Sequence, residues 1–88
     1  MPAQVEFSRD HLIGKSRLSV AEMTQLIAAT VAELPTVKAV AVEDDGEIAV
    51  DLVTGKRIEL ATIPVAHQLN ESIASRRTIL DDLVKRCA

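Results

Sequence analysis

The hydrophobic residues between positions 18 and 34 recur at helical spacing. Ser19 and Glu22 form a capping box, because the Ser19 hydroxyl can accept a hydrogen bond from the Glu22 amide while the Glu22 carboxylate accepts one from the Ser19 amide. Residues three and four apart lie on one face of a helix. The apolar stripe consists of Val20, Met23, Ile27, Val31 and Leu34. The pattern predicts a helix that begins at Val20 and ends at Pro35.

From residue 37 to residue 63 the apolar period changes to two. The alternating aliphatic residues fall into three groups, Val40/Val42, Ile48/Val50/Leu52 and Ile58/Leu60. Alternation interrupted by glycine-containing turns is typical of a three-stranded antiparallel meander. A three-residue loop Asp44-Asp45-Gly46 would pair Val42 with Ile48 and keep the large aliphatic residues on one face. The same parity argument pairs Leu52 with Ile58 at the second turn.

The opposite face of the predicted sheet is small and flat. Ala39, Ala41 and Ala49 lie at its centre, with Asp51 and Arg57 beside them. Such a face suits a contact with a second copy about a two-fold axis, in which Asp51 and Arg57 meet their opposites. In the alternative, the C-terminal helix folds back over this face and the domain is a three-layer monomer.

Two further segments flank the helix and the sheet. Residues 63–88 are helical, and we favour two helices over one because Ser72 or Ser75 can cap a new helix near residues 70–75. Residues 3–8 alternate in the manner of a short edge strand. The predicted fold class is α+β: a three-stranded antiparallel meander, with or without this edge strand, packed with one N-terminal helix and one or two C-terminal helices. We expect residues 1–17 to be an N-terminal arm and residues 18–88 a single domain.

Composition narrows the classes of function. The chain has 88 residues, of which 48% are hydrophobic and 26% charged, and its apolar stretches fall short of the ~20 residues that cross a bilayer, so we expect no membrane association. Phe7 is the one aromatic residue, which excludes single-stranded nucleic acid binding by base stacking. A net charge of −3 argues against nucleic acid as a partner. The N-terminal pattern and the single Cys87 predict a cytoplasmic protein.

Residues that support chemistry are few and dispersed. His67 and Glu71 lie one helical turn apart, while His11 and Cys87 stand near opposite ends of the chain. A transition-metal site needs three or four ligands that converge, and this spacing does not supply them. A nucleophile likewise needs a base and an orienting group beside a pocket. We therefore expect no enzymatic activity, metal, cofactor or small-molecule substrate.

Two stretches resemble bacterial protein families. The first comprises GEIAVDLVTGKRIEL at residues 46–60 and, after a helix, RRTILDDLV at residues 76–84. It resembles the opening segment of the YtpQ-like uncharacterised bacterial proteins, in which two strands and a short helix lead to a charged helix start with a similar apolar stripe. The junction from Leu34 to Val37 is similar to one in the alkaline-shock-like small bacterial proteins. The resemblance implies a strand–strand–helix–helix order and assigns no functional residue.

Together these features predict a small bacterial protein–protein interaction module without catalytic activity. It would act as an adaptor, regulator or inhibitor and bind a protein partner or itself as a homodimer. The expected contact residues are Ala39, Ala41, Ala49, Asp51 and Arg57. The alternative function is binding of nucleic acid or another polyanion through a basic C-terminal region. Its anion-binding residues would be Arg76, Arg77, Lys85 and Arg86.

Overall fold

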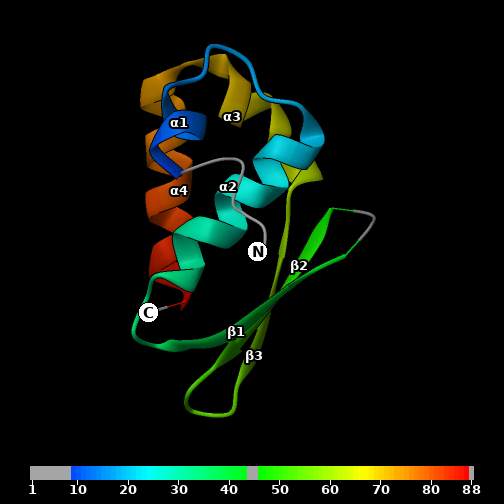
Figure 1. The fold of residues 1–88 in the computed structure, drawn as a ribbon, viewed down its shortest axis with the longest axis vertical. Helices are drawn as coiled ribbons and strands as arrows, with labels where there is room; N and C mark the ends of the chain where they lie inside the picture. Colours follow the sequence, from blue (N-terminus) through cyan, green and yellow to red (C-terminus); the bar gives the residue numbers. More distant parts are fainter. Residues whose placement is uncertain (1–8, 44–45, 88) are drawn as a thin grey trace, which may run out of the picture.

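The computed structural model describes residues 9–43 and 46–87 and has the predicted α+β architecture (Figure 1). The two N-terminal helices are α1 (Arg9–Gly14) and α2 (Val20–Ala32). The strands are β1 (Val37–Val42), β2 (Glu47–Leu52) and β3 (Arg57–Ala61). They are followed by a 3-10 helix η1 (Ile63–Val65) and by α3 (Ala66–Glu71) and α4 (Ile73–Cys87). The edge strand expected over residues 3–8 lies outside the described residues, as do Asp44 and Asp45.

Helix α2 begins where the capping box predicts. The Glu22 amide donates to the Ser19 hydroxyl at 3.2 Å, and the Ser19 amide donates to the Glu22 carboxylate at 2.9 Å. Both bonds satisfy amides that the first helical turn leaves without a backbone partner. The helix ends at Ala32, three residues before the predicted end at Pro35.

The buried face of α2 differs in part from the predicted stripe. Val20 is 46% exposed, whereas Leu26, which the stripe omitted, is fully buried. Val20 therefore lies at the edge of the packed surface, whereas the turns from Met23 to Val31 are buried on one side. They contribute to one core cluster with residues from every helix and from β2 and β3, including Leu12, Leu26, Ile27, Val31, Ile48, Val50, Leu60, Leu69, Leu80 and Leu83.

The sheet has the strand order β1-β2-β3, and its first hairpin has the predicted register. Val42 pairs with Ile48 and Val40 with Val50. Gly46, at the end of this turn, has a φ of 85°, a conformation that is readily accessible to glycine. The register places the large aliphatic residues on the face that the helices cover.

The register of the second hairpin differs from the predicted one by two residues. Val50, not Leu52, pairs with Ile58. The Leu52 amide donates to the Lys56 carbonyl at 2.8 Å around a loop of residues 53–55, and Gly55 has a φ of 94°. A positive φ at the last loop position is typical of a three-residue hairpin, and Gly46 and Gly55 both have one. A shift of two preserves which face each side chain occupies.

The helices lie on one side of the sheet (Figure 1). Helix α2 contacts β1 and β2, and it also contacts α1 and α4. Leu80 and Leu83 of α4 belong to the same core cluster as Ile48 and Val50. The alternative in which the C-terminal helix covers the alanine face is therefore wrong, because the apolar side of α4 is buried among the other helices and the large aliphatic residues.

The predicted break in the C-terminal region is confirmed at Ser72. This residue has extended backbone angles, φ −164° and ψ 164°, between α3 and α4. Its hydroxyl accepts a hydrogen bond from the Ser75 amide at 3.0 Å, so Ser72 caps α4. Asn70 ties α3 to the segment before α2, since its side-chain amide bonds both the N–H and the carbonyl of Leu18 at 2.9 Å.

Helix α1 was not predicted. It lies within the stretch expected to be an arm, yet Leu12 and Ile13 are only 2% and 7% exposed and belong to the core cluster. Its six residues are too few to form a stable helix alone. Tertiary contacts therefore hold α1 in place.

Candidate functional site

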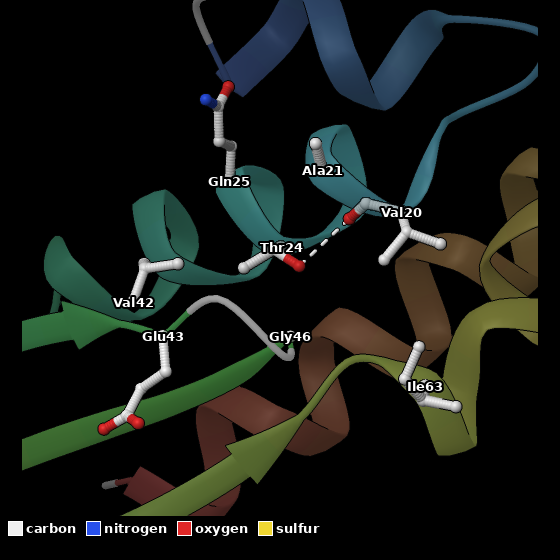
Figure 2. Close-up of a pocket in the computed structure, with 8 residues that line it drawn as sticks. All are labelled: Val20, Ala21, Thr24, Gln25, Val42, Glu43, Gly46 and Ile63. Atoms are coloured by element: carbon white, nitrogen blue, oxygen red, sulfur yellow. Dashed lines mark hydrogen bonds between the residues drawn. The ribbon is translucent and has the colours of Figure 1, made fainter.

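A surface groove lies between the first turns of α2 and the adjoining end of the sheet (Figure 2). Its volume is about 440 Å³. The residues that line it are Val20, Ala21, Thr24, Gln25, Val42, Glu43, Gly46 and Ile63. Large hydrophobic side chains are exposed at five described positions, and three of these, Val20 (46%), Val42 (53%) and Ile63 (58%), border this groove. We call it the α2 groove.

Two threonines fix the relation between α2 and the end of β3. The Thr24 hydroxyl donates to the Val20 carbonyl at 2.9 Å, and it lies 2.9 Å from the Thr62 hydroxyl. Thr62 is fully buried, and its amide donates to the Gly46 carbonyl at 3.0 Å. These bonds satisfy buried polar groups and hold the helix start against the strand ends. They place Val20 on the same side of the groove as Ile63, as Figure 2 shows.

Gly46 lines the groove and lies between Val42 and Ile63 in Figure 2. A Cβ at this glycine would lie 3.8 Å from Cγ1 of Ile63, which is an ordinary van der Waals distance. Ile63 therefore lies close to Gly46, next to the hydrogen bond from the Thr62 amide to the Gly46 carbonyl. Val42, at the end of β1, points toward α2 in Figure 2. The exposed apolar groups Val20, Val42 and Ile63 thus come from three separate elements.

Among the described residues, the one acidic side chain that lines the α2 groove belongs to Glu43, and it points outward from the groove in Figure 2. In the sequence, the segment that follows it, Asp44-Asp45-Gly46-Glu47, is also acidic. Glu22, in the first turn of α2, adds no net charge there, because it pairs with the Lys15 ammonium, which lowers its pKa to about 2. The groove can therefore receive an apolar side chain whose neighbours are basic.

The lining residues offer the Thr24 hydroxyl, the Gln25 amide and the Glu43 carboxylate, and the Thr24 hydroxyl is already bonded to the Val20 carbonyl and the Thr62 hydroxyl. Across residues 9–43 and 46–87, no three His, Cys, Asp or Glu side chains are grouped so that they could hold a metal ion. None of the helices in the described part of the chain has the length and apolar character needed to cross a membrane.

The five residues predicted for self-association do lie together on the open sheet face. Ala41 pairs with Ala49, Ala39 with Asp51, and Asp51 with Arg57. Ala39 and Ala41 are exposed, whereas Ala49 in the central strand is 5% exposed. Asp51 and Arg57 approach each other within one chain at 3.7 Å, with both side chains about half exposed, so their attraction is weak.

Arg76 is not part of an anion-binding surface, and that prediction is wrong for this residue. It is 1% exposed. Its Nε donates to the Leu69 carbonyl at 2.7 Å, and Nη1 donates to the carbonyls of Leu12, Ile13 and Lys15 at 3.1, 2.7 and 2.7 Å. The guanidinium thus neutralises the carbonyl ends of α1 and α3, where a helix favours positive charge. Burial lowers the pKa of Arg76.

The other three predicted basic residues are exposed and do not form one patch. On a helix with 3.6 residues per turn, Arg77 and Arg86 point to opposite sides, and Arg77 and Lys85 lie about 12 Å apart along the axis. Arg86 instead borders a second groove of about 470 Å³ beside the β2–β3 turn, which Lys56 and Cys87 also line. Cys87 is fully buried, and burial raises the pKa of its thiol.

The sequence pattern did not identify the α2 groove. Val20 and Val42 were assigned to apolar stripes and therefore to the core, and Ile63 precedes a proline that favours a helix start. The position of a residue within its helix or strand could have indicated the groove, because Val20 is the first residue of α2 and Val42 is the last residue of β1. Apolar residues at the first or last position of an element are the ones that packing can leave exposed.

Comparisons of the chain with protein-family models, with curated proteins and with solved structures found no significant match. The resemblance to the YtpQ-like proteins stays a prediction. The functional argument for this chain therefore depends on its own surfaces.

Proposed function

We propose that this chain is a protein–protein interaction module without catalytic activity, and that its α2 groove binds a partner segment with an apolar side chain flanked by lysine or arginine. The observation that carries the proposal is the convergence of Val20, Val42 and Ile63 around one groove. Isolated exposed hydrophobic residues are common, but several grouped in a concavity are typical of an interaction site. Glu43 lines the groove, and the sequence that follows it is acidic, which favours a basic partner.

Self-association through the open sheet face is a second candidate for the same class of function. Its support is that Ala39 and Ala41 are exposed on a face that the described helices leave uncovered. Polyanion binding has less support, because Arg76 is sequestered and the remaining basic residues are dispersed.

A peptide titration tests the proposal. The probe is a short synthetic peptide with valines flanked by lysines, and the matched peptide has glutamates in place of the lysines. We expect the lysine peptide to shift the amide resonances of Val42 and Ile63. The dissociation constant should be about 1 mM, as is typical of small contacts. The glutamate peptide should bind at least about tenfold more weakly.

Two variants assign the binding to the groove. Ile63→Asp should abolish the shifts, because it places a charge among the apolar groups that line the site. Ile73→Asp is the matched control, since Ile73 is also an exposed isoleucine, at 44%, but lies outside the groove. Equal binding of the two peptides, or equal binding by both variants, would contradict the proposal.

A further inference from the structure

Strand β3 forms one edge of the sheet, and half of its backbone hydrogen-bonding groups face away from β2. The Lys56 carbonyl and the Thr62 amide, just outside the two ends of β3, both form hydrogen bonds toward β2, at 2.8 and 3.0 Å. Backbone groups alternate in direction along an antiparallel strand. The amides and carbonyls of Arg57, Glu59 and Ala61 therefore point to the open edge. Within the described part of the chain, β2 is the one strand that pairs with β3.

The side of the sheet at which β3 lies has room for an added strand. Helix α2 packs mainly against β1, which forms the opposite edge of the sheet. A strand placed beside β3 would therefore not collide with α2. Arg57 and Glu59 are both exposed, so this edge is accessible to solvent and to a partner.

Strand β3 carries one positive and one negative side chain on the open sheet face. Arg57 and Glu59 are two residues apart and lie on the same face. Glu59 has no ion pair among the described residues. Arg57 approaches Asp51 at 3.7 Å in the half-exposed contact described above, so most of its five N–H donors remain available. A complementary strand would place an anion opposite Arg57 and a cation opposite Glu59.

We infer that β3 of one copy of this chain pairs antiparallel with β3 of a second copy, about a two-fold axis at Ile58. Arg57 then lies opposite Glu59 of the second copy, and Glu59 lies opposite its Arg57. Both residues point their backbone groups to the open edge, so the two pairs form four backbone hydrogen bonds. On the helix-covered face the two Ile58 side chains, each half-buried in the monomer, come together.

The charges of β3 select both the second copy and this register. A shift of the pairing in one direction would place Glu59 opposite Glu59, and a shift in the other direction would place Arg57 opposite Arg57. Like charges directly opposite each other destabilise a strand pair, whereas opposite charges stabilise it. The strand is therefore complementary to itself in the register centred on Ile58.

The resulting assembly is a dimer with a continuous six-stranded sheet. Because the contact is isologous, both copies use the same edge and association stops at two chains. Four backbone hydrogen bonds and one pair of isoleucines make a small interface, so the dimer is weak, with a dissociation constant of about 1 mM. This inference goes beyond the proposed function, since none of the residues that line the α2 groove belongs to β3.

Charge reversal tests the register by sedimentation, with interference detection because the chain has no tryptophan or tyrosine. Arg57→Glu leaves two acidic side chains on the edge and Glu59→Arg leaves two basic ones, so each variant should dimerise at least about tenfold more weakly than the unmodified protein. The double variant Arg57→Glu/Glu59→Arg restores opposite charges across the axis and should dimerise as the unmodified protein does. An equimolar mixture of the two single variants should form a heterodimer of twice the 9.5 kDa monomer mass and nothing larger. Circular dichroism verifies that each variant is folded.

Two controls separate this contact from the alternatives. Lys38→Glu changes the net charge by the same amount as Arg57→Glu, but Lys38 lies on β1 at the other edge, so dimerisation should be unchanged. Ala41→Glu should also leave dimerisation unchanged, because it alters the centre of the open sheet face and not the edge.

Amide hydrogen exchange measures the pairing directly. The amides of Arg57 and Glu59 should exchange more slowly as the protein concentration rises, because each would donate to a carbonyl of the second copy. The amides of β1 should show no such dependence on concentration.

Three results would overturn the inference. They are an unmodified protein that stays monomeric at about 1 mM and low salt, a double variant that stays monomeric while the unmodified protein dimerises, and dimerisation that Ala41→Glu abolishes while Arg57→Glu retains it. If the unmodified protein is monomeric but the valine–lysine peptide binds the α2 groove, the inference fails and the proposed function stands. If the dimer forms as described and the peptide does not bind, the inference stands and the proposed role of the groove fails.

Discussion

Replacing Arg76 with methionine removes the positive group that joins α1 to α3 and α4. Methionine keeps an unbranched side chain and a similar helix propensity, so the change isolates the guanidinium. The carbonyls of Leu12, Ile13, Lys15 and Leu69 all lose their side-chain donor. A hydrogen bond from a charged donor contributes about 1.5–3 kcal/mol, but four that share one side chain do not add.

The loss of stability cannot exceed the free energy needed to detach α1 from the rest of the domain. If the carbonyls recover hydration by releasing this helix, the main cost is the burial of Leu12 and Ile13, about 1.5–3 kcal/mol each before the gain in chain entropy. We therefore expect the free energy of unfolding to fall by about 3 kcal/mol, which is a large part of the roughly 4–13 kcal/mol expected for 88 residues. Hydrogen exchange in α1 should accelerate more than exchange in α2.

Urea denaturation measures the global effect, and two variants calibrate it. Arg77→Met alters the neighbouring exposed arginine and should change stability by less than about 0.5 kcal/mol. Arg76→Lys should lie between the two, because an ammonium retains the charge but lacks the planar fork that reaches both helix ends. If Arg76→Met is within about 0.5 kcal/mol of Arg77→Met, the guanidinium does not hold α1 in place.

Two further predictions concern the capped start of α2 and the second turn. The pKa of Glu22 is lowered from 4.5 to about 2 in the folded state. The carboxylate therefore stabilises the fold fully above pH 4.5, and this contribution is lost as the pH falls toward 2. In acid denaturation Glu22→Gln should lose less stability over this range than the unmodified protein, and an unchanged acid profile would contradict the assignment. Gly55→Ala should lower the free energy of unfolding by about 1–2 kcal/mol, because alanine disfavours the φ of 94° at this position. Gly14→Ala is the control, since Gly14 has no positive φ and a Cβ there would meet open space. Equal shifts of the melting temperature in the two variants would refute this reasoning.

Local signals in the sequence were sufficient for several elements. The start of α2 follows from hydrogen bonds between residues three apart, Ser19 and Glu22. The break at Ser72 depends on the hydrogen bond from the Ser75 amide to the Ser72 hydroxyl, which also joins residues three apart. The first hairpin register follows from the parity of its loop and the burial of Ile48 and Val50. Each of these features depends on residues close together in the sequence, so the sequence pattern can predict it.

Tertiary structure decided the rest, because the deciding contacts join residues far apart along the chain. Arg76 looked like a solvated cation, and its burial depends on carbonyls more than sixty residues away, on Leu12 and Ile13. Helix α1 depends on the same contacts. Loop parity could not distinguish the two registers of the second hairpin, since a shift of two residues leaves every side chain on the same face.

The α2 groove illustrates the same distinction at the candidate site. By itself the sequence determined that Val20, Val42 and Ile63 are apolar, and that the turn between β1 and β2 is acidic. It could not determine that these three residues remain exposed and adjacent, because that requires the packing of α2 against the strand ends through Thr24 and Thr62. Exposure is a property of the assembled domain, since each element can bury only the part of its apolar surface that another element reaches.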